Sequence, residues 1–306
     1  MILVLHQGAL GDFILTLSII QAVRSTLNAR HVQVIASSAA ASLAAGRSAV
    51  DACLHPESVG LHTLFAEAGP LDHRLQAALD NADLVLNFLA DAQSNIHHRL
   101  TRATAAHVVS VDPRPTPQTL SASIHITRQW AQSLADAGLP LIDPQPPVIR
   151  LTDHTPIQTP PDKRTVVIHP GSGGRAKCWP VENFIALADT LSNARIVWMV
   201  GPAELETNRP LTTAVRNRVE THNETLIAEP DLEQAARTLL ANRPALYIGN
   251  DAGTTHLAAA LNIPTIAIFT TTNPKTWKPQ GRHITIIQPN QTQPLKLLIP
   301  HMGTLV

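Results

Sequence analysis

A polar cluster at residues 249–256 carries side chains that suit a phosphate group. An apolar run before it has the pattern of a buried strand, and strong helix formers follow it. Gly253 lets the backbone approach a ligand closely, and the first N–H groups of the helix attract an anion. Thr254, Thr255 and His256 add donors in the first helical turn. The cluster therefore predicts a phosphate or diphosphate site that works without a metal ion.

Asp251 lies in the same cluster, and its negative charge repels a phosphate. Its carboxylate is suited to accept hydrogen bonds from hydroxyl groups, such as those of a sugar. The alternative is that Asp251 only caps the helix and that His256 packs at the domain surface. The cluster alone does not separate these interpretations.

A glycine-rich loop at residues 169–177 is a second place suited to phosphate. It follows an apolar strand and contains Gly173, the hydroxyl of Ser172 and the ammonium group of Lys177. The loop lacks the Gly-Lys-Ser/Thr ending of a P-loop, which argues against ATP hydrolysis of that type.

Glu204 follows the next predicted strand, residues 196–200. Its carboxylate can accept both hydroxyls of a ribose, although a surface carboxylate is the simpler explanation. The loops 169–177, 201–204 and 249–256 all follow strands, and in open α/β sheets ligands bind at the carboxyl ends of strands. Together the loops predict a site for the base, ribose and diphosphate of a nucleotide.

The loop at residues 6–12 offers another carboxylate. It follows an apolar strand and precedes a helix that we expect from Asp12 to about Arg24. Its two glycines do not form Gly-x-Gly-x-x-Gly, which disfavours a dinucleotide site. Asp12 is either a helix cap or a catalytic carboxylate that faces the nucleotide loops across a cleft.

Strand and helix patterns alternate through both halves, which predicts an α/β fold of doubly wound parallel sheets. Prolines cluster between Leu139 and Lys163, and they favour a stiff linker over a helix. We therefore expect an N-terminal domain at 1–150, a proline-rich linker at 151–163 and a C-terminal domain at 164–306. In the first half the predicted strands after the first are 32–36, 52–54, 84–88 and 107–111.

Three arginines lie in or near the loops that follow the predicted strands of the first half. They are Arg99, Arg102 and Arg114. They are either solvated surface charges or contacts for an anionic acceptor, and the sequence leaves both interpretations open.

Composition argues against several classes of function. Lys plus Arg and Asp plus Glu number 23 each, so no overall positive field recruits nucleic acid. The two cysteines build no disulfide framework, which fits a reducing cytoplasm. No apolar run approaches the ~20 residues of a membrane span, and the start lacks the basic region of a signal peptide. We expect a cytoplasmic monomer, with peripheral contact at the inner face of the cytoplasmic membrane left open.

Three segments carry the pattern of a known family. They are Gly8-Ala9-Leu10-Gly11-Asp12, His169-Pro170-Gly171-Ser172 with Lys177-x-Trp179-Pro180, and Asn250-Asp251-x-Gly253-x-x-His256-Leu257-Ala258 followed by Asn273-Pro274. These segments resemble the bacterial heptosyltransferases of glycosyltransferase family 9. The resemblance runs over nearly the whole chain. It implies two Rossmann-like domains in the GT-B arrangement, with a nucleotide-sugar donor in the C-terminal domain and a lipid-linked or glycan acceptor in the N-terminal one.

The resemblance also implies a reaction. A heptose would pass from ADP-heptose to the inner core of lipopolysaccharide, with inversion at the anomeric carbon and without a metal or other cofactor. Asp12 would be the general base that takes the proton of the acceptor hydroxyl. Ser172, Lys177 and the segment 253–256 would stabilise the leaving diphosphate. Glu204 would bind the ribose, and Asp251 the hydroxyls of the donor sugar.

Other functions stay open beside this one. The same chemistry with another nucleotide-sugar and glycan acceptor is the nearest alternative. A GT-B-like nucleotide-sugar epimerase would need further acid and base residues, and a non-catalytic sugar-nucleotide binding protein would need none. Two departures concern specificity: His6 stands where the family often has a basic residue, and Thr270 where a glycine is common.

Overall fold

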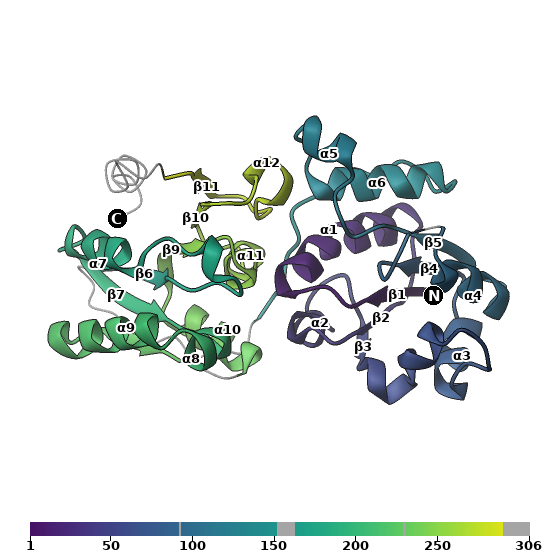
Figure 1. Cartoon of the computed structure of the whole chain (residues 1–306), viewed down its shortest axis with the longest axis horizontal. Coiled ribbons are helices and arrows are strands. Elements are labelled where there is room, and N and C mark those ends of the chain that lie inside the picture. The colour runs from purple at the N-terminus through teal and green to yellow at the C-terminus, as the bar shows by residue number, and fades with distance from the viewer. Residues whose placement is uncertain (92, 152–162, 229–230, 290–306) are drawn as a thin grey trace. The chain divides into compact units, whose positions relative to one another are not determined.

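The computed structural model describes residues 1–91, 93–151, 163–228 and 231–289 (Figure 1). The chain divides into two compact units, Met1–Ile149 and Arg150–Val306. Each unit is built on one parallel sheet with helices on both faces. Most of the predicted proline-rich linker at 151–163 lies outside the described residues.

The first unit contains a five-stranded parallel sheet in the order β3-β2-β1-β4-β5. Helices α1 and α6 lie on one face of this sheet, and α3 and α4 lie on the other (Figure 1). The predicted doubly wound arrangement is therefore confirmed in this unit. The strands are β1 (Ile2–His6), β2 (Val32–Ala36), β3 (Ala52–Leu54), β4 (Leu84–Asn87) and β5 (His107–Ser110); the helices are α1 (Leu10–Thr26), α2 (Ala39–Ala44), α3 (His73–Asp80), α4 (Asn95–Ala103), α5 (Pro117–Ser121) and α6 (Ile126–Asp136).

Helix α1 begins at Leu10, two residues before the start that the sequence predicts. Ala9 is the N-cap, and the carboxylate of Asp12 in the first turn accepts a hydrogen bond from the Ala9 N–H at 3.2 Å. A carboxylate in this position satisfies a backbone donor that the helix itself leaves unpaired. Asp12 therefore lies inside the helix rather than at its cap.

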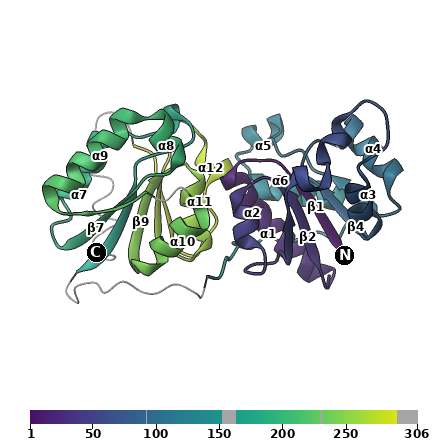
Figure 2. The same cartoon turned by 90° about the horizontal axis from the view of Figure 1, so that it is seen from below.

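The second unit contains a six-stranded parallel sheet in the order β11-β10-β9-β6-β7-β8. Helices α7 and α9 cover one face of this sheet, and α10 and α11 cover the other (Figure 2). The strands are β6 (Arg164–His169), β7 (Ala194–Met199), β8 (Thr225–Ile227), β9 (Pro244–Asn250), β10 (Thr265–Ile268) and β11 (Ile284–Ile287); the helices are α7 (Val181–Asp189), α8 (Pro202–Thr207), α9 (Arg209–His222), α10 (Leu232–Ala241), α11 (Gly253–Ala260) and α12 (Pro274–Trp277).

Strands β6 and β9 are neighbours at the point where the strand order of the second sheet reverses. The chain leaves β6 toward β7 on one side, and it leaves β9 toward β10 on the other side. Loops diverge at such a point and leave room for a ligand at the carboxyl ends of the strands. The predicted phosphate loops 169–177 and 249–256 both begin there.

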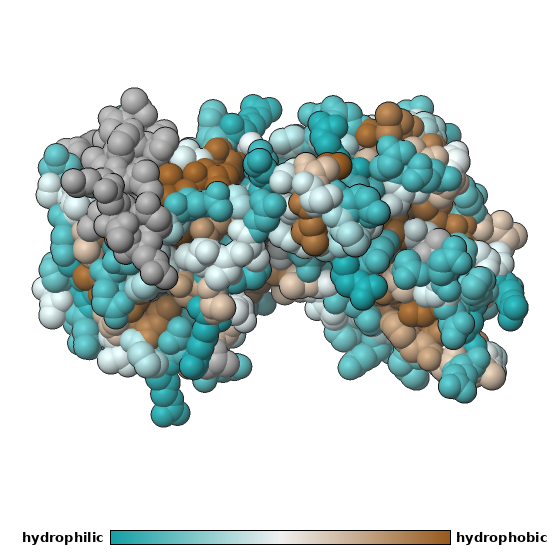
Figure 3. Space-filling model, turned by 45° about the horizontal axis from the view of Figure 1, so that its top comes forward, coloured by the Kyte–Doolittle hydropathy of each residue, from teal (hydrophilic) through white to brown (hydrophobic). Residues whose placement is uncertain are grey.

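The surface carries few large apolar side chains. Within the described residues those that are exposed all belong to the first unit: Leu27, Phe65, Leu120, Ile124 and Leu141. On the displayed face, apolar side chains form separate patches among polar ones (Figure 3). No helix in the described part of the chain is both long and apolar enough to cross a membrane.

Candidate active site

Helix α11 presents its N-terminus at the carboxyl end of β9. Its N-cap is Ala252, whose side chain accepts no hydrogen bond from the first turn. The N–H groups of Thr255 and His256 are bonded to the Ala252 carbonyl, at 3.0 and 3.3 Å. The N–H groups of Gly253 and Thr254 precede these and have no acceptor within the helix, which suits them to bind an anion.

The Asp251 side chain lies just before this helix and is almost completely buried, with 7% of its surface exposed. Its Oδ2 atom accepts hydrogen bonds from Lys177 Nζ at 3.0 Å and from Thr272 Oγ1 at 2.5 Å. Its Oδ1 atom lies 3.9 Å from His256 Nε2. Asp251 is therefore not the helix cap, and His256 is buried rather than packed at the surface.

The Asp251 carboxylate is ionised in spite of its burial. Burial alone would raise its pKa, but the contacts with His256, Thr272 and Lys177 outweigh that effect and lower the pKa to about 2. A buried negative charge is therefore balanced by an ammonium group that remains 41% exposed. Thr272 was not among the predicted site residues, and nothing in its local sequence pattern indicates this contact.

The glycine-rich loop after β6 lies against the same cluster. Ser172 Oγ donates a hydrogen bond to the main-chain carbonyl of Asp251 at 2.9 Å. A side chain added at Gly173 would meet open space, so the backbone at this position is accessible. The predicted loops 169–177 and 249–256 thus form one site.

Asn250 joins the backbones of three segments at the base of the site. Its side chain is fully buried. Its Oδ1 atom accepts a hydrogen bond from the Trp179 N–H at 2.9 Å, and its Nδ2 donates to the Pro170 carbonyl at 2.7 Å. Asn250 therefore positions the phosphate loops.

Glu204 is buried beneath the glycine-rich loop, so its interpretation as a surface carboxylate is wrong. Its Oε2 atom accepts a hydrogen bond from the Gly201 N–H at 2.8 Å and lies 3.6 Å from His169 Nε2. A Cβ atom at Gly171 would lie 2.2 Å from Glu204 Cδ, so this contact requires glycine. Burial would raise the pKa of Glu204, but His169 and the Gly201 N–H lower it below its ordinary value.

His169 connects the two sides of the site. Its Nδ1 atom lies 3.2 Å from Thr254 Oγ1, and its Nε2 faces Glu204. These partners favour the tautomer in which Nε2 carries the proton and Nδ1 accepts from the threonine hydroxyl. Sequence analysis quoted His169 only as part of a motif and missed this connection.

Asp12 belongs to the first unit and lies in the first turn of α1, near the buried His6 at the end of β1. His6 is 2% exposed, and its Nδ1 accepts a hydrogen bond from the Gly8 N–H at 3.2 Å. Burial lowers the pKa of His6 to about 4, so the ring is neutral near pH 7. A Cβ atom at Gly8 would lie 2.8 Å from His6 Cε1 and 3.1 Å from Asp12 Cβ, so this turn needs glycine.

Two of the three arginines considered for an anionic acceptor are bonded to their own unit. Arg99 donates to the carbonyls of Thr63 and Gly69, both at 3.1 Å. Arg114 pairs with Asp112 at 3.1 Å. Arg102 lies exposed in the last turn of α4.

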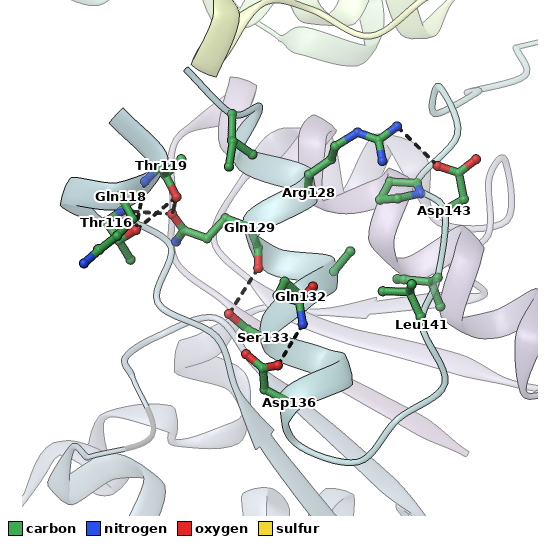
Figure 4. Close-up of a pocket in the computed structure, with 14 residues that line it drawn as sticks. Thr116, Gln118, Thr119, Arg128, Gln129, Gln132, Ser133, Asp136, Leu141 and Asp143 are labelled. Carbon is green, nitrogen blue, oxygen red and sulfur yellow. Dashed lines mark hydrogen bonds and ion pairs between the residues drawn. The ribbon is translucent and has the colours of Figure 1, made fainter. Parts of the chain in front are cut away.

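A cavity of about 870 Å³ in the first unit lies apart from the predicted residues. It is lined by α5, α6 and the segment 141–144 (Figure 4). Its polar side chains bind one another: Gln129 accepts from Thr119 Oγ1 at 2.5 Å, and Arg128 lies 3.6 Å from Asp143. We assign this cavity no part in the site.

The site of the second unit combines free helix N–H groups, a half-exposed ammonium group and two buried, ionised carboxylates. The N–H groups and the ammonium group can bind a diphosphate, and the carboxylates can bind hydroxyl groups of sugars. Within the described residues, His, Cys, Asp and Glu side chains do not gather in groups of three that could hold a metal ion.

Comparison with known proteins assigns the chain to a family. The model of glycosyltransferase family 9 (heptosyltransferase) matches residues 105–297, which is more than half of the chain. This chain belongs to glycosyltransferase family 9. It is therefore a heptosyltransferase-like glycosyltransferase, as the three sequence segments predict.

Solved structures share the fold over the full length of this family 9 chain. The ADP-heptose LPS heptosyltransferase II of E. coli is 16% identical, with a TM-score of 0.69 over 99% of this chain and 98% of that one. The E. coli heptosyltransferase WaaC with ADP is also 16% identical, with a TM-score of 0.70 over 100% and 99%. The two Rossmann-like units thus match those of GT-B heptosyltransferases, which confirms the predicted fold.

One relative is similar in sequence over part of its length. A Haemophilus influenzae protein, whose name assigns it to the glycosyltransferases, is 26% identical over 222 residues. The alignment covers 64% of this chain and 62% of that protein.

Proposed function

We propose that this family 9 glycosyltransferase transfers a heptose from ADP-heptose to a sugar of the lipopolysaccharide inner core. The observation that carries the proposal is the contact between Lys177 and Asp251 beside the open N-terminus of α11. Structural relatives from E. coli are described with ADP and with ADP-2-deoxy-2-fluoro heptose. In this proposal the unit of residues 1–150 binds the acceptor, and residues 164–306 bind the donor.

The diphosphate of the donor binds at the N-terminus of α11. The N–H groups of Gly253 and Thr254 donate to its oxygens, and the positive end of the helix dipole favours its charge. Lys177 has three N–H donors and gives one to Asp251, so it can bond to a phosphate oxygen at the same time. Ser172, Gly173, Thr255 and His256 complete the surroundings of the phosphates.

The two carboxylates of the site bind the two sugars of the donor. Glu204 accepts hydrogen bonds from the ribose, and Asp251 accepts them from the heptose, and lowered pKa values keep both groups ionised. The Glu204 side chain is only 5% exposed, so nucleotide entry must shift the glycine-rich loop above it.

Asp12 acts as the general base of the transfer. It takes the proton of an acceptor hydroxyl while the hydroxyl oxygen attacks the anomeric carbon of the heptose. The bond from that carbon to the diphosphate breaks on the opposite face, so the configuration inverts and ADP leaves. Because the carboxylate already accepts from the Ala9 N–H, most of the acceleration comes from positioning and from stabilising the leaving group.

The acceptor and the location of the reaction are part of the same proposal. A lipid-linked glycan would be reached at the cytoplasmic face of the membrane by a monomer in peripheral contact. In this proposal the enzyme requires neither nucleic acid nor a metal ion. Its two substrates are the nucleotide-sugar donor and the glycan acceptor.

Calorimetric binding of ADP, UDP, GDP and CDP tests the donor site. We expect ADP to bind most tightly and Lys177→Ala to weaken it about tenfold, because a charge-assisted hydrogen bond is lost. Lys177→Gln keeps a donor for Asp251 and serves as a second variant if removal of the side chain disturbs folding. Lys163→Ala is the matched control. Lys163 directly precedes β6, so it lies at the end of this strand that is opposite to the site.

The nucleotide preference decides between the candidates. Preference for UDP or GDP would keep glycosyl transfer and discard heptose as the sugar. Failure of all four nucleotides to bind would contradict the proposal. Release of an epimerised free sugar from the donor alone would identify an epimerase instead.

A further inference from the structure

His169 joins a carboxylate to a hydroxyl group inside the second unit. It is the last residue of β6, and its side chain is 3% exposed. Its Nε2 atom lies 3.6 Å from Oε2 of Glu204, and its Nδ1 atom lies 3.2 Å from Oγ1 of Thr254 in the first turn of α11. A carboxylate, an imidazole ring and a hydroxyl group therefore form a chain that ends at the proposed diphosphate site.

The carboxylate end of this chain is fixed. Glu204 is the third residue of α8, and its Oε2 atom also accepts a hydrogen bond from the N–H of Gly201, the N-cap of that helix, at 2.8 Å. The Glu204 side chain is 5% exposed, and its pKa lies below the ordinary value. A negative charge therefore faces the imidazole ring of His169 in a place where water screens it weakly.

The hydroxyl end of the chain is in conflict with a bound diphosphate. A neutral imidazole ring has only one N–H group. When that group is on Nε2, toward Glu204, the Nδ1 atom of His169 is an acceptor and the Thr254 hydroxyl must donate to it. The Thr254 oxygen then presents only lone pairs to its other neighbours. A diphosphate oxygen bound at the N–H groups of Gly253 and Thr254 would meet an acceptor rather than a donor.

Uptake of one proton by His169 resolves the conflict. If the Thr254 hydroxyl simply turned toward the diphosphate, the buried Nδ1 atom would lose its donor, which costs free energy. In the protonated ring, Nδ1–H donates to the Thr254 oxygen, and the hydroxyl is free to donate to the diphosphate. Every hydrogen atom then has an acceptor, and the Glu204 carboxylate balances the new positive charge.

The other titratable groups close to Glu204 do not compete for this proton. Glu204 also acts on Tyr247 and Cys178, but both are neutral near pH 7 because burial raises the pKa of each. The charge of the nearby Asp251 carboxylate is balanced by Lys177 at 3.0 Å.

His256 is the alternative site for a proton. Its Nε2 atom lies 3.9 Å from Oδ1 of Asp251. Within the described residues its buried Nδ1 atom has no hydrogen-bond partner, so it sets the direction of no hydroxyl group. The conflict over the Thr254 hydroxyl therefore concerns His169 and not His256.

We propose that His169 is a positioning residue for the leaving group. It takes up one proton from solvent when the diphosphate of the donor binds, and it thereby directs the Thr254 hydroxyl to donate to a diphosphate oxygen. The proton returns to solvent when ADP leaves. Because negative charge grows on the diphosphate during transfer, this hydrogen bond stabilises the transition state. The inference rests on the proposed function, since it concerns the donor site of the same reaction.

Calorimetric titration with ADP-heptose, without an acceptor, counts the proton. Neither phosphate of ADP-heptose titrates near neutral pH, unlike the terminal phosphate of ADP, so a proton that is taken up goes to the protein. Titrations at pH 7.5 in PIPES and in Tris, which differ in their enthalpy of ionisation, give the number of protons. We expect the wild type to take up at least about 0.5 proton, and to bind ADP-heptose about threefold more tightly at pH 7 than at pH 8.

His169→Asn replaces the ring by an amide that does not titrate, and it should lower the uptake below about 0.1 proton. His222→Asn is the matched control and should keep the wild-type uptake. His222 also contacts a threonine hydroxyl, with Nδ1 2.8 Å from Thr221 Oγ1, but it lies exposed at the end of α9. If His169→Asn does not fold, Thr254→Val and Thr254→Ser test the same point: valine should remove most of the uptake, and serine should retain it.

Two results would overturn the inference. One is binding of ADP-heptose by the wild type without proton uptake. The other is equal uptake by the wild type and His169→Asn, which would assign the proton to His256 or to another group. Either result leaves the donor site in place, because ADP-heptose still binds. If neither ADP-heptose nor ADP binds, the proposed function and this inference fail together.

Discussion

At the scale of single residues, the pair formed by Asp251 and Lys177 sets the electrostatics of the proposed donor site. The buried carboxylate is held ionised, and the half-exposed ammonium group balances it. In the proposed function, a diphosphate at α11 meets this ammonium group first, because Lys177 is 41% exposed whereas Asp251 is 7% exposed. The carboxylate in turn holds the Lys177 ammonium group in place through the hydrogen bond of 3.0 Å.

The Asp251 carboxylate should make the protein sensitive to acid. Its pKa is lowered from 3.8 to about 2 in the folded chain, so it contributes ~2 kcal/mol of stability above pH 4. That contribution is lost as the pH falls from about 4 through 2, because the unfolded chain takes up the proton first. Denaturation of wild type and Asp251→Asn between pH 5 and 2 should show their difference in unfolding free energy shrinking by that amount. A constant difference would contradict the assignment.

Sequence analysis found the residues of this pair but not their relation. The residue types and their place after strands predicted both Lys177 and Asp251, yet they lie 74 positions apart and only the fold shows that they touch. Thr272 and His169 were missed for the same reason. Threonine and histidine have many ordinary structural uses, so their roles become visible only when their partners are known.

At the scale of elements, Asn250 connects the end of β9 with the segment after β6. A single amide group satisfies a buried N–H of Trp179 and a buried carbonyl of Pro170. Backbone groups of this kind must be paired when water is excluded. The geometry of the phosphate loops therefore depends on a residue that needs no contact with the ligand.

Asn250→Ala should destabilise the second unit by about 3 kcal/mol, because two buried backbone groups lose their partner. Urea denaturation followed by tryptophan fluorescence measures the effect. Asn217→Ala, on the exposed face of α9, should change the unfolding free energy by less than about 0.5 kcal/mol. If the two variants unfold alike, Asn250 does not hold the loops together.

Elements in the cores were easier to predict than those at the edges. The central strands are continuous apolar runs, and the sequence located them within a few residues. Strands β8 and β11 lie at the two edges of the second sheet, are short and are only partly buried, so their patterns are weak. The start of α1 was misplaced because Leu10 and Gly11 do not have the residue types that usually open a helix.

At the scale of the whole molecule, each unit repeats a doubly wound sheet and places its polar loops at the carboxyl edge. The first unit contains Asp12, and the second contains the site at α11. The proposed reaction requires one group from each unit. Alternation of strand and helix predicted both sheets, whereas the division of chemistry between the units came from the resemblance to family 9.

The central claim is transfer of heptose from ADP-heptose with Asp12 as the base. The most direct measurement is mass spectrometric detection of heptosylated acceptor, made with wild type and with Asp12→Asn, together with calorimetric binding of ADP to both. We expect the wild type to form product and the variant to lose at least about a hundredfold in rate while its affinity for ADP is unchanged. Undiminished transfer by Asp12→Asn, or consumption of other nucleotide-sugars but not of ADP-heptose, would contradict the claim.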